Sequence, residues 1–225
     1  GLDAFARGDL VTAIGYYRSA LTRAPQRGDI RLELAMLYLD LGMAVESAAE
    51  LSRVQQADER AARMLAHGWR SLAAVDRSGL QRLLQRLSVM DAAPHERVDA
   101  ASLALAAGDS RAASAIVTGA TWRTLHAPDD LTSAPYRALW GVCELCTLAL
   151  LQYRLGDAAD GAKTAVGAAA ALDALEARGF VWHGLHYRRA GLLAQDGRSD
   201  AALDSLERAV GLGWRRAWMM RVDPA

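Results

Sequence analysis

Turn residues recur along this chain at a nearly constant interval, and that interval constrains the fold more than any other feature. A Gly or a short polar turn ends one helix-favouring stretch, and another such stretch begins within a few residues. Successive turns are 34, 34, 32, 48 and 41 residues apart. A period of about 34 residues with two helices in each unit indicates a repeat array in which helical hairpins stack on their neighbours. The turns lie at Gly8, Gly42, Asp76, Gly108, Gly156 and Gly197.

The stretches between the turns favour helix. Ala, Leu, Arg, Glu and Asp dominate them, whereas Val, Ile, Thr and the aromatic residues are sparse. A Gly just past a helix end adopts the left-handed conformation at little cost, and an Asp or Ser after it caps the next helix. No run alternates apolar and polar residues for long enough to predict a strand. The sequence therefore predicts an all-α solenoid of about six helical hairpins, irregular in the middle.

Composition excludes several classes of protein. The 225 residues include 26 basic and 26 acidic side chains, so no net charge draws the chain to nucleic acid or to an acidic membrane surface. Hydrophobic residues make up 52%, which is too many for an intrinsically disordered chain. No apolar run reaches the roughly 18–20 residues of a membrane span. We therefore expect a folded chain with no nucleic-acid partner and no membrane span in this segment.

The first hairpin carries the most specific set of repeat residues. They are Gly8 at the turn, Ala13 and Ala20 at two small positions, Tyr17 at an aromatic position and Pro25 at the helix stop. This segment resembles the second half of a tetratricopeptide repeat. Small residues at a helix crossing allow the two axes to approach to about 8–10 Å, and larger residues fill the space above and below.

The second and last hairpins match the same pattern. The resemblance implies a right-handed superhelical solenoid with a concave groove lined by the first helix of each hairpin. It also implies a non-enzymatic scaffold or adaptor that binds a protein or peptide partner in that groove. The matching residues are Leu34, Ala35, Tyr38, Ser47 and Leu51 in the second hairpin, and Ala190, Gly197, Ala202, Leu206 and Ala209 in the last.

The regularity of the pattern changes along the chain. We expect a single solenoid domain over residues 1–225. A helical pattern is already under way at Leu2, so we also expect this to be a piece of a longer chain. The expected segments are regular repeats at 1–58, degenerate repeats at 59–122, a loop at 123–133, a hairpin of long helices at 134–178, and a final repeat with a capping helix at 182–225.

The tail resembles the C-terminal tetratricopeptide arrays of bacterial multidomain regulators. Those arrays often end in a pattern that here reads Gly213-Trp214, Trp218 and Asp223-Pro224. In such regulators a winged-helix or cyclase module precedes the array, and this sequence contains neither. The second resemblance implies an alternative function, a ligand-sensing regulatory domain.

Two short motifs contain residues that could bind a metal or react with oxidants, but both are better explained as residues of the helix packing. Cys143 and Cys146 form a Cys-x-x-Cys pair inside a predicted helix, without the second pair that a tetrahedral zinc site needs; a redox-sensitive pair is the alternative. His183 and His186 share one helical face, with no carboxylate four residues away to complete a metal site. The sequence also lacks a Gly-rich phosphate loop, a Gly-x-Ser-x-Gly elbow and a His-Glu-x-x-His motif. We therefore predict no catalytic residue, no metal and no cofactor.

The register of the resembling family places a set of side chains in the groove. Arg and Tyr dominate interface energetics, so they are the better candidates, whereas Met36 also fits packing between repeats. Arg pairs with a carboxylate through two parallel hydrogen bonds, and Tyr adds contact area at little entropic cost. We therefore expect an acidic peptide or a C-terminal carboxylate as the partner. The predicted groove residues are Met36, Asp40, Arg63, Arg70, Tyr153, Arg154 and Tyr187.

Overall fold

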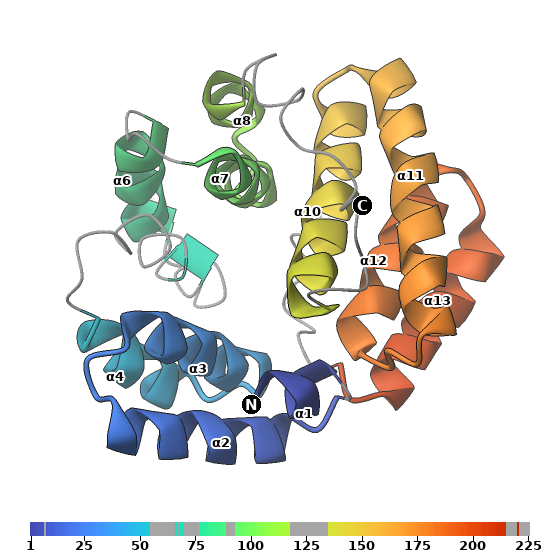
Figure 1. Ribbon diagram of the computed structural model, residues 1–225. Coiled ribbons are helices and arrows are strands. Elements are labelled where there is room, and N and C mark those ends of the chain that lie inside the picture. The colour runs from blue at the N-terminus through green and yellow to red at the C-terminus, as the bar shows by residue number, and fades with distance from the viewer. Residues whose placement is uncertain are drawn as a thin grey trace.

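The fold is all-α, as the sequence predicts. The computed structural model describes residues 1–6, 8–54, 66, 68–69, 77–88, 93–117, 135–214 and 220, and no strand occurs among them. The hairpins follow one another around a curve (Figure 1). None of the described helices combines the length and the apolarity needed to cross a membrane. The helices are α1 (Leu2–Ala6), α2 (Leu10–Arg23), α3 (Gly28–Asp40), α4 (Ala44–Ser52), α6 (Arg77–Ser88), α7 (Pro94–Ala106), α8 (Ser110–Ile116), α10 (Pro135–Arg154), α11 (Ala158–Ala177), α12 (His183–Gln195) and α13 (Ser199–Gly211).

Glycines in the left-handed conformation mark the turns between helices. All of those at the predicted turns have φ between 72° and 92°, where a side chain would add strain. These glycines confirm the predicted turn positions, except that Asp76 lies outside the described residues. The turn glycines are Gly8, Gly42, Gly108, Gly156 and Gly197.

Aspartates cap the helices that follow three of these turns. Asp9, Asp109 and Asp157 each accept a hydrogen bond from the backbone N–H three residues on, at 3.1, 2.9 and 3.4 Å respectively. Such a cap satisfies one of the N–H groups that a helix start leaves without an intrahelical partner. Each Gly-Asp pair therefore ends one helix and starts the next, which is why the hairpins can be located from the sequence.

Small residues lie at the helix crossings, where the repeat register predicts them. Ala13 and Ala35 are 0% exposed and Ala202 is 8% exposed. Ala20, near the end of α2, is only partly buried, although the register predicts full burial there too. Within each of the hairpins α3–α4, α7–α8, α10–α11 and α12–α13 the two helices pack against one another.

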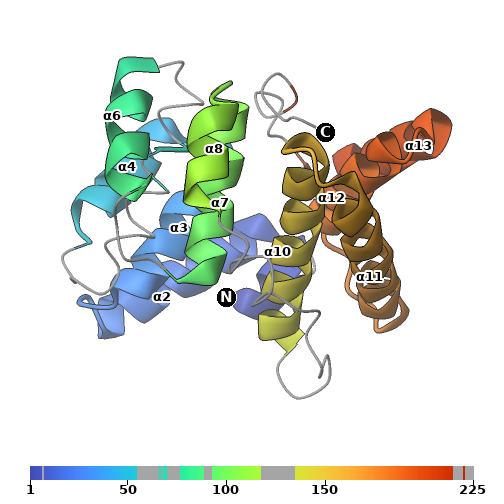
Figure 2. The ribbon, with the colours of Figure 1, turned by 90° about the horizontal axis from the view of Figure 1, so that it is seen from above.

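The first helices of three successive hairpins stack side by side. The helix α10 packs against α7 on one side and against α12 on the other. The view from above shows the same order of α7, α10 and α12 (Figure 2). These three helices form a continuous wall, which we call the first-helix wall.

The N-terminal helix contacts the far end of the series. The rings of Phe5 and Trp182 have centroids 4.8 Å apart, and both side chains are buried. A Cβ on Gly8 would lie 3.5 Å from the carbonyl oxygen of Val181 and 3.6 Å from that of Leu212. In a simple solenoid each repeat contacts only its neighbours. Here α1 packs against the residues that flank the α12–α13 hairpin, so the first and last parts of the described chain meet (Figure 1).

Candidate functional site

Ionisable side chains on three helices of the first-helix wall act on one another electrostatically. Arg188 and His95 act electrostatically on Asp99, and His95 and Asp99 act on Glu144, so these groups lie close together. Glu96 acts on Asp99 as well. We call the set the charged strip: His95, Glu96 and Asp99 on α7, Glu144 on α10 and Arg188 on α12.

Two carboxyls of the strip are partly withdrawn from water. Burial raises the pKa of Asp99 to about 6, although Arg188 and His95 act in the opposite direction. Burial also raises the pKa of Glu144, where His95 opposes the effect and Asp99 adds to it. Within the described residues neither carboxyl forms a hydrogen bond or an ion pair.

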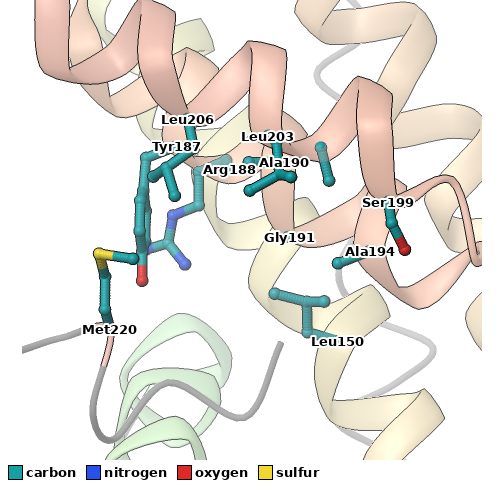
Figure 3. A pocket seen from close by; sticks show the side chains of 11 residues that line it. Leu150, Tyr187, Arg188, Ala190, Gly191, Ala194, Ser199, Leu203, Leu206 and Met220 are labelled. Atoms are coloured by element: carbon teal, nitrogen blue, oxygen red, sulfur yellow. The ribbon is translucent and has the colours of Figure 1, made fainter.

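A cavity of about 340 Å³ opens between α12 and α13, next to the strip (Figure 3). Its described lining is mainly apolar and includes Leu150 of α10 and Leu203 of α13. Arg188 is the one charged residue in that lining, while Tyr187 and Ser199 contribute hydroxyl groups. The guanidinium of Arg188 lies beside Tyr187 at one end of the cavity, and the Ser199 hydroxyl lies at the other end (Figure 3).

An aromatic stack supports one wall of this cavity, and its rim is apolar. The rings of Tyr187 and Trp214 have centroids 4.6 Å apart and planes inclined by 14°, and Trp214 is buried. At the rim, Leu203 is 59% exposed and Met220 is 53% exposed. A ligand that covered this rim would remove apolar surface from water, which is favourable.

A second group of carboxyls lies on α3. Burial raises the pKa of Glu33 to about 7, and the negative charges of Asp29 and Asp40 add to the effect. The pKa of Asp29 is lowered, because the Arg27 guanidinium donates hydrogen bonds to it. Asp40 is 4% exposed. The α3 carboxyls therefore occupy three different environments on one helix.

The comparisons with known proteins bear on the first hairpins. A family model described as the tetratricopeptide repeat matches residues 4–67, which include the signature residues of the first two hairpins. Residues 4–67 carry tetratricopeptide repeats. No curated protein and no solved structure matches it significantly. Repeats of this family generally mediate protein–protein interaction.

The three predicted groove residues in the second half of the chain lie in different surroundings. Tyr187 lines the cavity, and Arg154 is exposed on α10, one turn beyond Leu150. Tyr153 packs against α11, where a Cβ on Gly161 would lie 3.1 Å from the Tyr153 Cγ. Arg154 and Tyr187 therefore lie on adjacent helices of the first-helix wall, while Tyr153 contributes to the packing of the long-helix hairpin.

The remaining predicted groove residues belong to the first third of the chain. Met36 is partly buried and packs against the cluster formed by Ala35, Leu51 and Ala66. Asp40 is buried at the end of α3. Arg63 and Arg70 lie outside the described residues. The groove formed by these residues stays a prediction.

Sequence reasoning missed Asp99, Glu144 and Arg188, although a signal for two of them exists. Asp99 and Glu144 each stand between two buried residues of small or apolar type, on helices that pack against several neighbouring helices. A charged residue inside such an apolar stretch has to face either a buried partner or an open surface. Looking for that pattern in successive first helices would have found the strip.

The two cysteines and both of the paired histidines, His183 and His186, are buried in the helical packing. Cys143 and Cys146 are free, 6% and 0% exposed, and burial raises the pKa of Cys146 to about 12, which disfavours the reactive thiolate. Burial lowers the pKa of His186, whose Nε2 lies 3.4 Å from Glu176 Oε1. Among the described residues no three His, Cys, Asp or Glu side chains are grouped in a way that could hold a metal ion.

Proposed function

We propose that this chain is a non-enzymatic scaffold that binds a protein or peptide partner along the first-helix wall. The charged strip carries the proposal, because it presents ionisable groups from α7, α10 and α12 on one surface. A partner that lies across three consecutive helices can contact all of them at once. The tetratricopeptide repeats in residues 4–67 support this class of function.

The proposed partner is an acidic peptide or a C-terminal carboxylate, as the sequence suggests. Arg154 is an exposed arginine on the described wall that can pair with its carboxylates. Arg63 and Arg70 would extend this basic surface toward the N-terminus. Glu144 would oppose an acidic partner near the middle of the strip, since like charges at short distance repel. The partner's carboxylates should therefore lie against the arginines and away from Glu144.

Charge-neutralising variants test this arrangement. Glu144→Gln removes the opposing carboxylate, so recovery of the proposed partner from a bacterial lysate should rise. Arg154→Gln removes an attractive cation, so recovery of the same partner should fall. The matched controls are Glu207→Gln on α13 and Arg178→Gln after α11, because both side chains are exposed and off the wall.

The identity of the partner retained by the parent protein is established first by mass spectrometry, and its amount is then compared among variants. The proposal requires opposite changes for Glu144→Gln and Arg154→Gln, with neither control different from the parent. Equal recovery by all four variants would remove the first-helix wall from the binding mechanism.

A further inference from the structure

Helix α11 turns a mainly apolar face to solvent, on the side opposite the residues that it buries. The helix packs against α10 and α12, and its buried residues include Ala168, Leu172 and Leu175. The opposite face is exposed along the length of the helix, and Val166 near its middle is 73% exposed. Seen from above, α11 lies at an outer edge of the fold (Figure 2). A helix face of this kind is a candidate surface for contact with another protein.

The residues along the middle of this face have the spacing of a coiled-coil seam. Their intervals are 4, 3, 4, 3 and 4 residues, as between the a and d positions of a heptad repeat. Alanines at such positions allow a second helix to approach to about 8–10 Å. We call this set the α11 seam: Ala159, Lys163, Val166, Ala170, Asp173 and Ala177, all of which are exposed.

The α11 seam matches itself when two copies of the helix run in opposite directions. Its order is Ala, Lys, Val, Ala, Asp, Ala, so reversal places Lys163 opposite Asp173 of the second copy. The same reversal places Val166 opposite Ala170, and the two terminal alanines face each other. A two-fold interface requires this property, since one surface has to be complementary to itself.

We propose that two copies of this chain associate through the α11 seam as an antiparallel, two-fold symmetric pair. The charges select this arrangement over the alternative. A parallel pair would bring Lys163 against Lys163 and Asp173 against Asp173, and like charges at an interface disfavour a pairing. The antiparallel pair instead forms two Lys163–Asp173 ion pairs, one on each side of the two-fold axis.

Both charged residues of the seam are accessible to a second copy. Lys163 is the only lysine in the chain, its side chain is 80% exposed, and it lies 3.3 Å from Asp160. Asp173 is 66% exposed, although its Oδ1 accepts a hydrogen bond from Arg189. A lysine within an apolar seam restricts pairing to the register that supplies an acidic partner. Lys163 is therefore the residue that fixes the register of the pair.

The size of the seam predicts a weak and reversible dimer. A helix of 20 residues is about 30 Å long and about 10 Å wide, which gives a footprint of roughly 300 Å² on each copy. A standard interface buries about 800 Å² on each partner. Because α11 is the second helix of its hairpin, the seam lies outside the first-helix wall, and the pairing does not depend on the scaffold function.

Sedimentation equilibrium at protein concentrations up to about 1 mM tests the pairing, since that range populates a weak dimer. Lys163→Glu places acidic groups opposite each other, and Asp173→Lys does the same with basic groups. Each variant alone should therefore dimerise at least about tenfold more weakly than the parent. An equimolar mixture of the two variants should recover dimerisation, because both exchanged charges then face an opposite charge.

A third variant and two controls examine the rest of the surface. Val166→Glu places a charge in the apolar centre of the seam and should also weaken dimerisation at least about tenfold. Its matched control is Val45→Glu on α4, where the valine is 80% exposed. Arg111→Glu at an exposed position on α8 is the control for Lys163→Glu. Both controls should dimerise as the parent does, and circular dichroism should show the same helicity for all variants.

Three results would overturn the proposal. They are a parent that stays monomeric throughout the concentration range, seam variants that dimerise as tightly as the parent, and a mixture of Lys163→Glu and Asp173→Lys that stays monomeric. The last result would exclude the antiparallel register. None of them affects the scaffold proposal, whose test measures recovery of a different protein by variants at Glu144 and Arg154.

Discussion

The contact between Phe5 and Trp182 makes a strong prediction about cooperativity. Phe5 is 5% exposed, Trp182 is 8% exposed, and the two rings pack at 4.8 Å with an interplanar angle of 48°. Truncation of a buried Phe to Ala costs about 3–5 kcal/mol, because it removes apolar contacts and leaves a cavity. For a chain of this size each kcal/mol lowers the melting temperature by about 2–4 °C. Phe5→Ala should therefore lower it by about 6–20 °C.

A more specific prediction concerns which helices lose stability in Phe5→Ala. In an open solenoid a lesion in the first helix weakens its neighbours and fades along the array. Here Phe5 packs directly against the residue that precedes α12, so amide hydrogen exchange in α12 and α13 should accelerate in Phe5→Ala. Tyr16→Ala is the control, because Tyr16 is 58% exposed on α2 and its truncation should change stability by less than about 0.5 kcal/mol.

A double-mutant cycle with Phe5→Leu and Trp182→Leu isolates the contact itself. The coupling energy should be about 0.5–1.5 kcal/mol, the usual value for an aromatic pair beyond its buried area. Exchange rates in α12 and α13 that do not respond to Phe5→Ala, together with purely additive single variants, would refute the inference that the two ends of the array stabilise each other.

Three further predictions concern individual side chains. Ala13→Leu should destabilise the protein by about 1–3 kcal/mol in urea melts, because Ala13 is 0% exposed at a helix crossing and a larger side chain there forces its neighbours to move. The pKa of Glu33 is raised to about 7 in the folded protein, so the folded state binds the extra proton and loses stability as the pH rises from the ordinary Glu value toward 7. Glu33→Gln should therefore melt at a higher temperature than the parent at about pH 8 and show no such advantage at about pH 4. Cys143 and Cys146 should react with a thiol reagent in urea but not in the native protein, and rapid native labelling would contradict their burial.

The turns could be predicted from the sequence because their chemistry is local. A glycine with positive φ followed by an aspartate cap needs only a few neighbouring residues, as at Gly8-Asp9 and Gly108-Asp109. The small residues at the crossings could be predicted for a related reason, since the crossing lies at a fixed distance from the turn. Ala13 and Ala202 are buried as that register requires.

The candidate site could be predicted only in part, because it depends on how separate hairpins stack. Tyr187 was found from its register position, and the structure places it in the cavity wall. The cavity itself depends on the distance between α12 and α13 and on the stack with Trp214, which no local pattern specifies. The charged strip depends on the alignment of α7, α10 and α12, and the lengthened period between their turns conceals that alignment in the sequence.

The contact at Phe5 links the fold to the charged strip. Trp182 immediately precedes α12, and Arg188 lies in the second turn of that helix, where it belongs to the charged strip and to the cavity wall. The start of α12 is therefore held from outside its own hairpin by a residue of α1. A binding group is most effective when the helix that carries it is fixed before the ligand arrives, because less entropy is lost on binding. The position of Arg188 thus depends on a long-range contact, and the charged strip shares that dependence.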